Sequence, residues 1–248
     1  MANPLEQFEI HPAAPLSIAG VDASLTNAGI FMLISSLSVA VFVLMGVRRS
    51  NVVPGRWQSM VELCYEFIAG MVKENIGQKG RAYVPFVFTL FMFILAGNLI
   101  GLLPYSFTVT SHLAVTFAFA GLIFLATIVI GFINHGAHFL GMFVPKDTPI
   151  VLMPLIIVIE VISFLSRPIT HSVRLFANMT AGHILLKVFA GFIVSLLLAG
   201  GVLSGISVLP ALMIVILNAL ELLVAVVQAY VFALLTCVYL NDAVNLEH

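Results

Sequence analysis

The sequence predicts an all-α integral membrane protein with five to six helices. Apolar residues make up 61% of the 248 residues and charged residues only 8%, whereas about a quarter of a soluble domain is charged. Long stretches without Asp, Glu, Lys or Arg each reach the roughly 20 residues that a helix needs to cross a bilayer. A transmembrane barrel would show short alternating strands instead. The uncharged stretches are 23–47, 82–145, 188–220 and 222–241.

The N-terminal segment, residues 1–26, is predicted to be an extracytoplasmic tail. It carries Glu6 and Glu9 but no Lys or Arg, which is unlike the basic start of a signal peptide, so we expect no cleavage. The first span is predicted over residues 27–47.

Basic residues set the predicted orientation. None of the ten Lys and Arg precedes Arg48, and six of them lie in residues 48–81. Because basic residues near span ends collect in the cytoplasm, the N-terminus is expected outside and 48–81 inside, as a cytoplasmic or surface segment. Apolar residues at helical spacing predict a helix there that lies on the membrane or packs on the bundle. They are Trp57, Met60, Val61, Cys64, Phe67, Ile68, Met71 and Val72.

Residues 82–134 are predicted to form a two-span hairpin that turns outside the membrane near Pro104–Ser111. A cytoplasmic loop, 135–149, follows. His135 and His138 have a spacing that metal sites use, but no further ligand stands nearby, so no metal is predicted. Gly97 and Gly101 form a G-x-x-x-G pattern that favours close helix packing.

Residues 150–240 are predicted to form a long helical hairpin, followed by a C-terminal tail, 241–248, in the cytoplasm. Its first helix, 151–198, has about 48 residues and an expected length of about 72 Å, against a hydrocarbon core of ~30 Å. Its second, 207–240, would be about 51 Å long. Either both helices are strongly tilted or the longer one breaks at Pro154 or Pro168.

Polar residues recur on one face of the first long helix at steps of three and four. They are Glu160, Ser163, Arg167, His171, Arg174 and Asn178. The second long helix carries Asn218, Glu221 and Gln228.

Two interpretations of these residues stand side by side. Interhelical hydrogen bonds, at ~0.6 kcal/mol each, explain Ser163 and Asn218 as well as a functional role does. Arg167 and Lys187 fit snorkelling or pairing with acids. Arg174 fits these readings poorly, because an arginine near mid-membrane costs ~3 kcal/mol and such residues usually mark an ion path.

Three motifs resemble the a subunits of F-type rotary ATP synthases, the stator part of the membrane proton channel, and the resemblance extends over nearly the whole chain. The motifs are RLFANMTAGH (174–183), NALELLVAVVQAYVFALLTCVYLNDA (218–243) and PFVFTLFMFILAGNLIGLLPYSF (85–107). The resemblance implies a role in ATP synthesis and hydrogen ion transport. It also implies that the last two helices lie, strongly tilted, against a ring of c subunits with lipid-buried carboxyls.

The resemblance further implies roles in proton translocation for eight residues. Arg174 corresponds to the essential stator arginine that faces the c-ring. The residues expected on its cytoplasmic side suit an inner half-channel: Glu160, Ser163 and His171. Those expected to suit an outer, offset half-channel are Asn178, His183, Glu221 and Gln228. Many bacterial relatives carry an acid at the position of His183 and a histidine at that of Glu221, so the exchange supports a meeting of the two side chains.

An arginine suits this chemistry for two reasons. A ring carboxyl can face lipid only when protonated, and a guanidinium at ~4 Å favours its ionised form by about 4 kcal/mol at an effective dielectric near 20. Arginine also cannot be deprotonated in proteins, so it cannot pass protons between the half-channels.

The main alternative is a stand-alone ion-coupled secondary transporter. Many such transporters contain internal repeats, and this sequence shows none, which argues against the alternative. The H-E-x-x-H, G-x-S-x-G and P-loop patterns are also absent, so we expect neither an enzyme nor a cofactor. A net charge of −1 without a basic tract argues against nucleic acid. The two cysteines are expected to stay unpaired.

The resemblance implies as partners the c-subunit ring, b-type peripheral stalk subunits and the rest of the ATP synthase complex. The expected location is the bacterial inner (plasma) membrane, as a multi-pass protein with its N-terminus outside and its C-terminus in the cytoplasm.

Overall fold

The computed structural model describes residues 12–14, 17–18, 21–22, 24–48, 52–103, 106–143 and 152–245. The prediction of an all-α membrane protein is confirmed, since long helices make up nearly all of this part. Four strands of two or three residues precede the first helix, and the sequence prediction did not include them. They pair as two antiparallel ladders: β1 (Pro12–Ala14) with β4 (Leu25–Thr26), and β2 (Ser17–Ile18) with β3 (Val21–Asp22).

The first two helices have recognisable boundaries. Helix α1 (Asn27–Val47) follows Thr26, whose hydroxyl accepts a hydrogen bond from the backbone N–H of Gly29, as N-cap residues do. Helix α2 (Arg56–Ile76) ends at Gly77, whose φ of 79° is accessible mainly to glycine.

The next elements lie in the segment 82–134, for which a two-span hairpin was predicted. A 3₁₀ turn, η2 (Gln78–Tyr83), leads into α3 (Val84–Gly101). The short η3 (Val109–Ser111) precedes α4 (Leu113–His135), and η4 (Gly136–Phe143) follows it. Pro104 and Lys146 lie outside the described residues, as do parts of the predicted tails and of the loop 135–149.

The last two long helices match the expected lengths. Helix α5 (Met153–Ala199) has 47 residues and α7 (Val208–Val244) has 37, or about 70 and 56 Å. The short α6 (Val202–Ile206) lies between them. Pro168 lies inside α5 without ending it, so the helix does not break at either proline considered. Strong tilt stays a prediction.

Among the described residues, five helical segments are long and apolar enough to cross a membrane, so this is a multi-pass membrane protein. They are Asn27–Val47, Gln78–Gly101, Leu113–Phe143, Met153–Ala199 and Ser204–Val244. Helix α2 is not among them, as its amphipathic sequence predicted. Its predicted apolar face is only partly buried: Ile68 and Val72 are fully covered, whereas Trp57 and Met60 are exposed.

The chain forms two compact units, which are defined by their residues. The first unit comprises Met1–Val39, Phe93–His112 and Leu175–Ala229. The second unit comprises Ala40–Met92, Leu113–Arg174 and Tyr230–His248.

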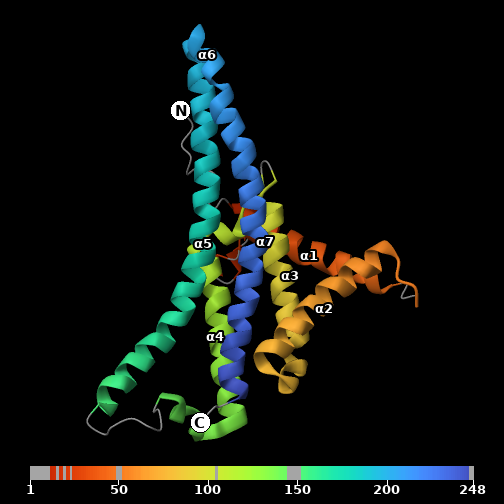
Figure 1. Cartoon of the computed structure of the whole chain (residues 1–248), viewed down its shortest axis with the longest axis vertical. Helices are drawn as coiled ribbons and strands as arrows, with labels where there is room; N and C mark the ends of the chain where they lie inside the picture. The colour runs from red at the N-terminus through yellow and green to blue at the C-terminus, as the bar shows by residue number, and fades with distance from the viewer. Residues whose placement is uncertain are drawn as a thin grey trace. The chain divides into compact units, whose positions relative to one another are not determined.

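In the first unit, the second part of α5 runs beside the first part of α7, joined through α6 (Figure 1). Gly200 and Gly201, with φ of 68° and 60°, make the sharp turn that precedes α6. The end of α3 is tied to α7, because the buried amide of Asn98 donates from Nδ2 to the carbonyl of Ala225 over 3.1 Å.

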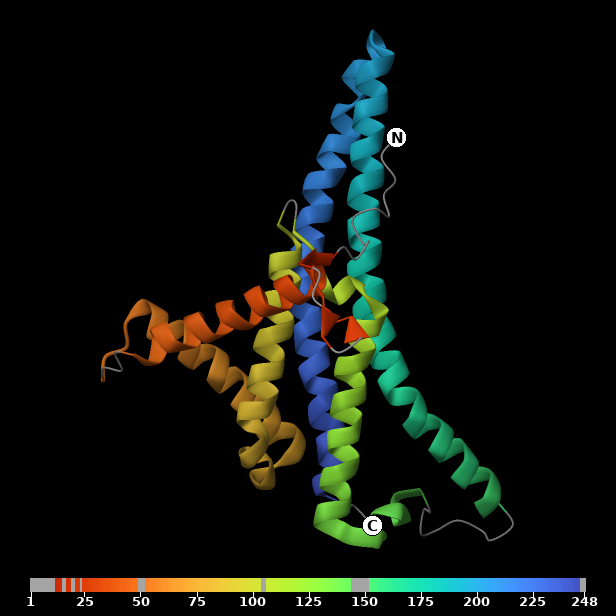
Figure 2. The same ribbon diagram turned by 180° about the vertical axis from the view of Figure 1, so that it is seen from behind.

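In the second unit, α4 lies along the end of α7, and the first turns of α5 lead away from α4 (Figure 2). Two side chains of α4 bond to the last carbonyls of α7, which lack helical partners. Asn134 Nδ2 lies 3.5 Å from the carbonyl of Ala243, and His135 Nε2 lies 3.3 Å from that of Val244. His135 therefore caps a helix end, a contact that the sequence did not indicate.

Candidate functional site

The polar face of α5 begins in the second unit with Glu160 and Ser163. Glu160 is half-buried and Ser163 is exposed, one turn further along the helix. Within the described part of the chain, neither side chain forms a hydrogen bond or an ion pair. The structure therefore places these two residues on α5 without joining them to another polar side chain.

Arg167, in the same unit, is paired. Its Nη1 forms an ion pair and hydrogen bond with Oδ2 of Asp242, near the end of α7. Its guanidinium carbon also lies 5.4 Å from the ring centres of Phe164 and Tyr239, within the range of cation–π contacts. Pairing with an acid was one of the readings that the sequence left open for Arg167.

Arg174 differs from Arg167. The side chain is exposed, although it lies within one of the five apolar segments that can span a membrane. Among the described residues it has no carboxylate partner and no hydrogen bond. The positive charge of Arg174 is therefore not balanced by a carboxylate of the described chain. Lipid tails cannot balance it either.

His171 lies one turn before Arg174 and is buried, with 3% of its surface exposed. Its ring packs on Phe232, with ring centres 3.7 Å apart, and on Tyr239 at 5.9 Å. Both ring nitrogens are buried without a hydrogen-bond partner among the described residues. Buried nitrogens of this kind usually bond to ordered water.

His183 and Glu221 meet in the first unit, as the sequence predicted. Nδ1 of His183 on α5 lies 3.8 Å from Oε1 of Glu221 on α7. The side chain of Glu221 is buried, and its oxygens form no hydrogen bond within the described part of the chain. The spacing exceeds a direct hydrogen bond, so a proton can pass here only through a bridging water or after a small closure.

The pair is close because Gly182 has no side chain. A Cβ added at Gly182 would lie 2.9 Å from Cδ and 3.1 Å from Cγ of Glu221 and would overlap with Oε1. The neighbouring glycine is therefore required for the carboxyl of Glu221 to approach α5.

Asn178 and Gln228 also meet in the first unit. Nδ2 of Asn178 donates to Oε1 of Gln228 over 2.9 Å. Gln228 is buried, whereas Asn178 is exposed. The four residues predicted for an outer half-channel thus form two pairs, each with one member on α5 and one on α7.

A polar cluster from the segment before α4 was missed by the sequence reasoning. Thr108 lies with its Oγ1 2.9 Å from Nε2 of His183. Thr110 donates to Oδ1 of Asn98 over 2.9 Å. In the sequence, the two threonines stand in the segment FTVTS, which resembles an ordinary turn. Only the contact with His183 therefore distinguishes Thr108.

Other polar residues of the spans take ordinary positions. Asn218 donates to the carbonyl of Ile214 in its own helix, over 3.0 Å, and makes no interhelical bond within the described residues. Lys187 is exposed. No three His, Cys, Asp or Glu side chains gather into a metal-binding group in the described ranges.

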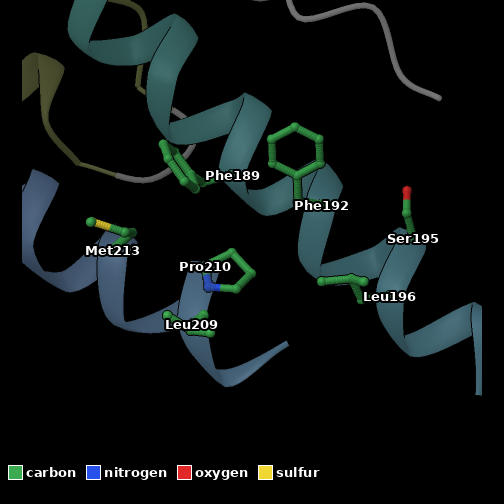
Figure 3. Close-up of a pocket in the computed structure, with 7 residues that line it drawn as sticks. All are labelled: Phe189, Phe192, Ser195, Leu196, Leu209, Pro210 and Met213. Atoms are coloured by element: carbon green, nitrogen blue, oxygen red, sulfur yellow. The ribbon is translucent and has the colours of Figure 1, made fainter. Parts of the chain in front are cut away.

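A groove of about 390 Å³ lies in the first unit between the end of α5 and the start of α7 (Figure 3). Apart from one serine its lining is apolar: Phe189, Phe192, Ser195, Leu196, Leu209, Pro210 and Met213. It contains none of the residues predicted for proton transfer. We therefore place the candidate site at the polar side chains and not at this groove.

Comparison with known proteins gives a consistent result. The model of the ATP synthase A chain family matches residues 29–241. ATP synthase subunit a of Parvibaculum lavamentivorans is 52% identical over 246 residues, covering 99% of this chain and 95% of the relative. The subunits a of Agrobacterium fabrum and Pelagibacter ubique are 53% and 49% identical, covering 100% and 99% of both chains in each pair. This chain therefore belongs to the ATP synthase A chain family.

Proposed function

We propose that this chain is the proton-translocating stator subunit a of a bacterial F-type ATP synthase. It would form two offset half-channels and present Arg174 to carboxyls that pass on a c-subunit ring. The observation that carries the proposal is the exposed side chain of Arg174, which has no acidic partner in the described chain although it lies in an apolar spanning segment.

A charged side chain inside the membrane carries a free-energy cost unless it has a partner. A lipid-facing arginine near mid-membrane costs ~3 kcal/mol or more, and arginines of membrane helices normally face a partner or water. Arg167 follows that rule inside the chain, through Asp242. Arg174 has no such acid in the described chain, and a carboxyl of another subunit beside a water-filled path would supply one. A rotor whose carboxyls ionise one at a time beside the arginine would meet this need.

The outer half-channel would run past His183, Glu221, Asn178 and Gln228. The contact of His183 with Glu221 brings together an imidazole and a carboxyl, two groups that exchange protons readily. The hydrogen bond between the side-chain amides of Asn178 and Gln228 joins the same two helices, α5 and α7. These amides would orient water and not carry the proton themselves.

The inner half-channel would run past Glu160, Ser163 and His171. All three lie on α5 before Arg174, whereas Asn178 and His183 of the outer path follow it. The ring nitrogens of His171 are covered, so its part in the path requires a water beside the ring.

The same proposal includes the topology and the partners. The N-terminus would lie outside and the C-terminus in the cytoplasm, because of the basic residues in 48–81. The long helices α5 and α7 would be strongly tilted against the c-ring. Subunits of a b-type peripheral stalk would hold the chain against rotation, and nucleotide chemistry would belong to other subunits.

Replacement of Arg174 by lysine tests the proposal. We expect Arg174→Lys to abolish proton-driven ATP synthesis in inverted membrane vesicles, since a lysine can lose its charge beside the ring carboxyl. Arg167→Lys is the matched control on the same helix, because a lysine there can still pair with Asp242. Retained synthesis in Arg174→Lys would contradict the proposed mechanism.

Purification distinguishes the stator from a stand-alone transporter. In mild detergent the chain is expected to co-isolate with a small proteolipid of two helices that carries a buried carboxyl. A solitary monomer that moves ions in liposomes would support the transporter instead.

A further inference from the structure

We infer that Asp242 is a positioning residue that keeps the proposed inner path open to protons, because it holds and neutralises Arg167. The inference rests on the proposed function, since it concerns protons that move between His171 and Glu160. It assigns a role to an acid near the end of α7 for which the sequence motifs implied none.

Arg167 lies in the middle of the proposed inner path. It stands seven residues after Glu160 and four before His171 on α5. Seven residues are nearly two full turns, so Arg167 shares one face of the helix with Glu160 and Arg174. A proton that moves between His171 and Glu160 must therefore pass the level of Arg167.

An unpaired cation at that level would oppose the passage of protons. At ~1.5 Å per residue, Arg167 lies about 6 Å along the helix from His171. A guanidinium at that distance would disfavour a second positive charge beside His171 roughly 100-fold at an effective dielectric near 20, and about threefold in bulk water. Arginine cannot lose its proton in a protein, so only a nearby negative charge can remove this barrier.

Asp242 supplies the negative charge. Its Oδ2 pairs with Nη1 of Arg167, and the guanidinium carbon lies 5.4 Å from the ring centres of Phe164 and Tyr239. The ring of Tyr239 also lies 5.9 Å from that of His171, so the ion pair stands beside the proposed path. The paired side chains are 23% and 31% exposed, and water therefore screens them in part. The barrier expected without Asp242 lies between the two limits, at about tenfold.

The ion pair also gives the two arginines of α5 different roles. Arg167 and Arg174 lie about 10.5 Å apart along the helix axis. Among the described residues Arg167 has an acid partner and Arg174 has none. Asp242 thus leaves Arg174 as the one arginine of α5 whose charge is available to a passing rotor carboxyl.

Two substitutions break the same ion pair from opposite sides. Asp242→Asn leaves an unpaired cation, whereas Arg167→Gln leaves no cation. We expect Asp242→Asn to lower passive proton flux about tenfold, and Arg167→Gln to keep flux within about twofold of the parent. The assay uses vesicles that carry the assembled membrane sector, and flux is expressed per assembled complex.

A double variant separates the effect of charge from that of folding. Arg167→Gln with Asp242→Asn lacks both the ion pair and the unpaired cation, so it is expected to conduct about five times faster than Asp242→Asn alone. If the pair served only to pack α5 against α7, both single variants would lower flux alike and the double variant would not recover it. That result, or parental flux in Asp242→Asn, would overturn the inference.

A second double variant keeps the test independent of the folding of Asp242→Asn. Arg167→Gln with Asp242→Lys moves the unpaired cation from α5 to α7 at the same level of the path. It is expected to conduct about tenfold more slowly than Arg167→Gln with Asp242→Asn, which differs only in charge at position 242. Equal flux in these two double variants would also overturn the inference.

Substitutions in the path itself separate the inference from the proposed function. If Glu160→Gln lowers flux while Asp242→Asn conducts like the parent, the role of Asp242 is refuted and the proposed path stands. If Glu160→Gln and His171→Leu both conduct like the parent, the proposed inner path itself fails.

Discussion

Replacing Gly182 by alanine tests how closely Glu221 must approach α5. The added methyl would lie 2.9 Å from Cδ of Glu221, whereas carbon atoms in contact prefer ~3.5 to 4.0 Å, so the carboxyl must retreat by about 0.5 to 1 Å. Because Gly182 and His183 are adjacent on one helix, a carboxyl pushed off Gly182 also changes its position relative to the ring of His183. A misplacement of about 1 Å can lower a rate 10²-fold, which sets the upper end of the expected loss.

The assay is proton flux into vesicles that carry the assembled membrane sector, driven by a potassium diffusion potential. Alanine in a helix interior is favoured over glycine by ~1 kcal/mol, so α5 itself should not weaken and assembly should be retained. Gly191→Ala is the control on the same helix, since nothing lies within 4 Å of a Cβ added there.

A second substitution can compensate for the first. Glu221→Asp shortens the side chain by one methylene and makes room for the new methyl, so the double variant Gly182→Ala with Glu221→Asp should conduct better than Gly182→Ala alone. Flux equal to that of the parent in Gly182→Ala would refute the claim that the position of this carboxyl matters.

Three further predictions concern other contacts. Arg167→Ala should reduce the amount of assembled complex, because it leaves Asp242 without its partner. The exchange of the two residues, Arg167→Asp with Asp242→Arg, should recover part of the assembled complex. Equal losses from the exchange and from the single variant would contradict the ion pair. Gly101→Ala should lower proton flux, since a Cβ there would displace Thr108 from its contact with His183. Gly121→Ala, where an added Cβ meets open space, should not lower it. Equal flux in the two variants would contradict a role for the position of Thr108 in the proposed path. Burial raises the pKa of the Cys64 thiol, so maleimide should label Cys64 slowly at pH 7 and faster as the pH rises. Maleimide should not label Cys237, which is fully buried. Rapid labelling of Cys237 would show that the end of α7 is not packed as described.

The helices were predictable because their signals are local. Long uncharged stretches and helical periodicity need no knowledge of partners, so they indicated the spans, the amphipathic α2 and the lengths of α5 and α7. Pro168 shows the limit of this reasoning. A proline usually bends or breaks a helix, but inside a long membrane helix neighbouring groups can compensate for the lost bond.

The contact of His183 with Glu221 was predictable, because each residue lies in a motif that resembles the family and the exchange of their types suggested that the two side chains meet. Other contacts of the candidate site were not predictable, because only the tertiary structure decides them. Nothing in the sequence indicates that Arg167 pairs with Asp242, 75 residues away, or that Arg174 has no acid partner in the described chain. The contact of Thr108 with His183 likewise joins a loop to a helix, and neither position has a pattern that indicates the other.

The most direct measurement is a density map of the intact complex in lipid that shows the side chain of Arg174. The account predicts that its guanidinium faces a carboxyl of a neighbouring rotor subunit, within about 4 Å in at least one rotor position. A guanidinium that points into bulk solvent, or is held by an acid of its own chain with no rotor beside it, would contradict the account.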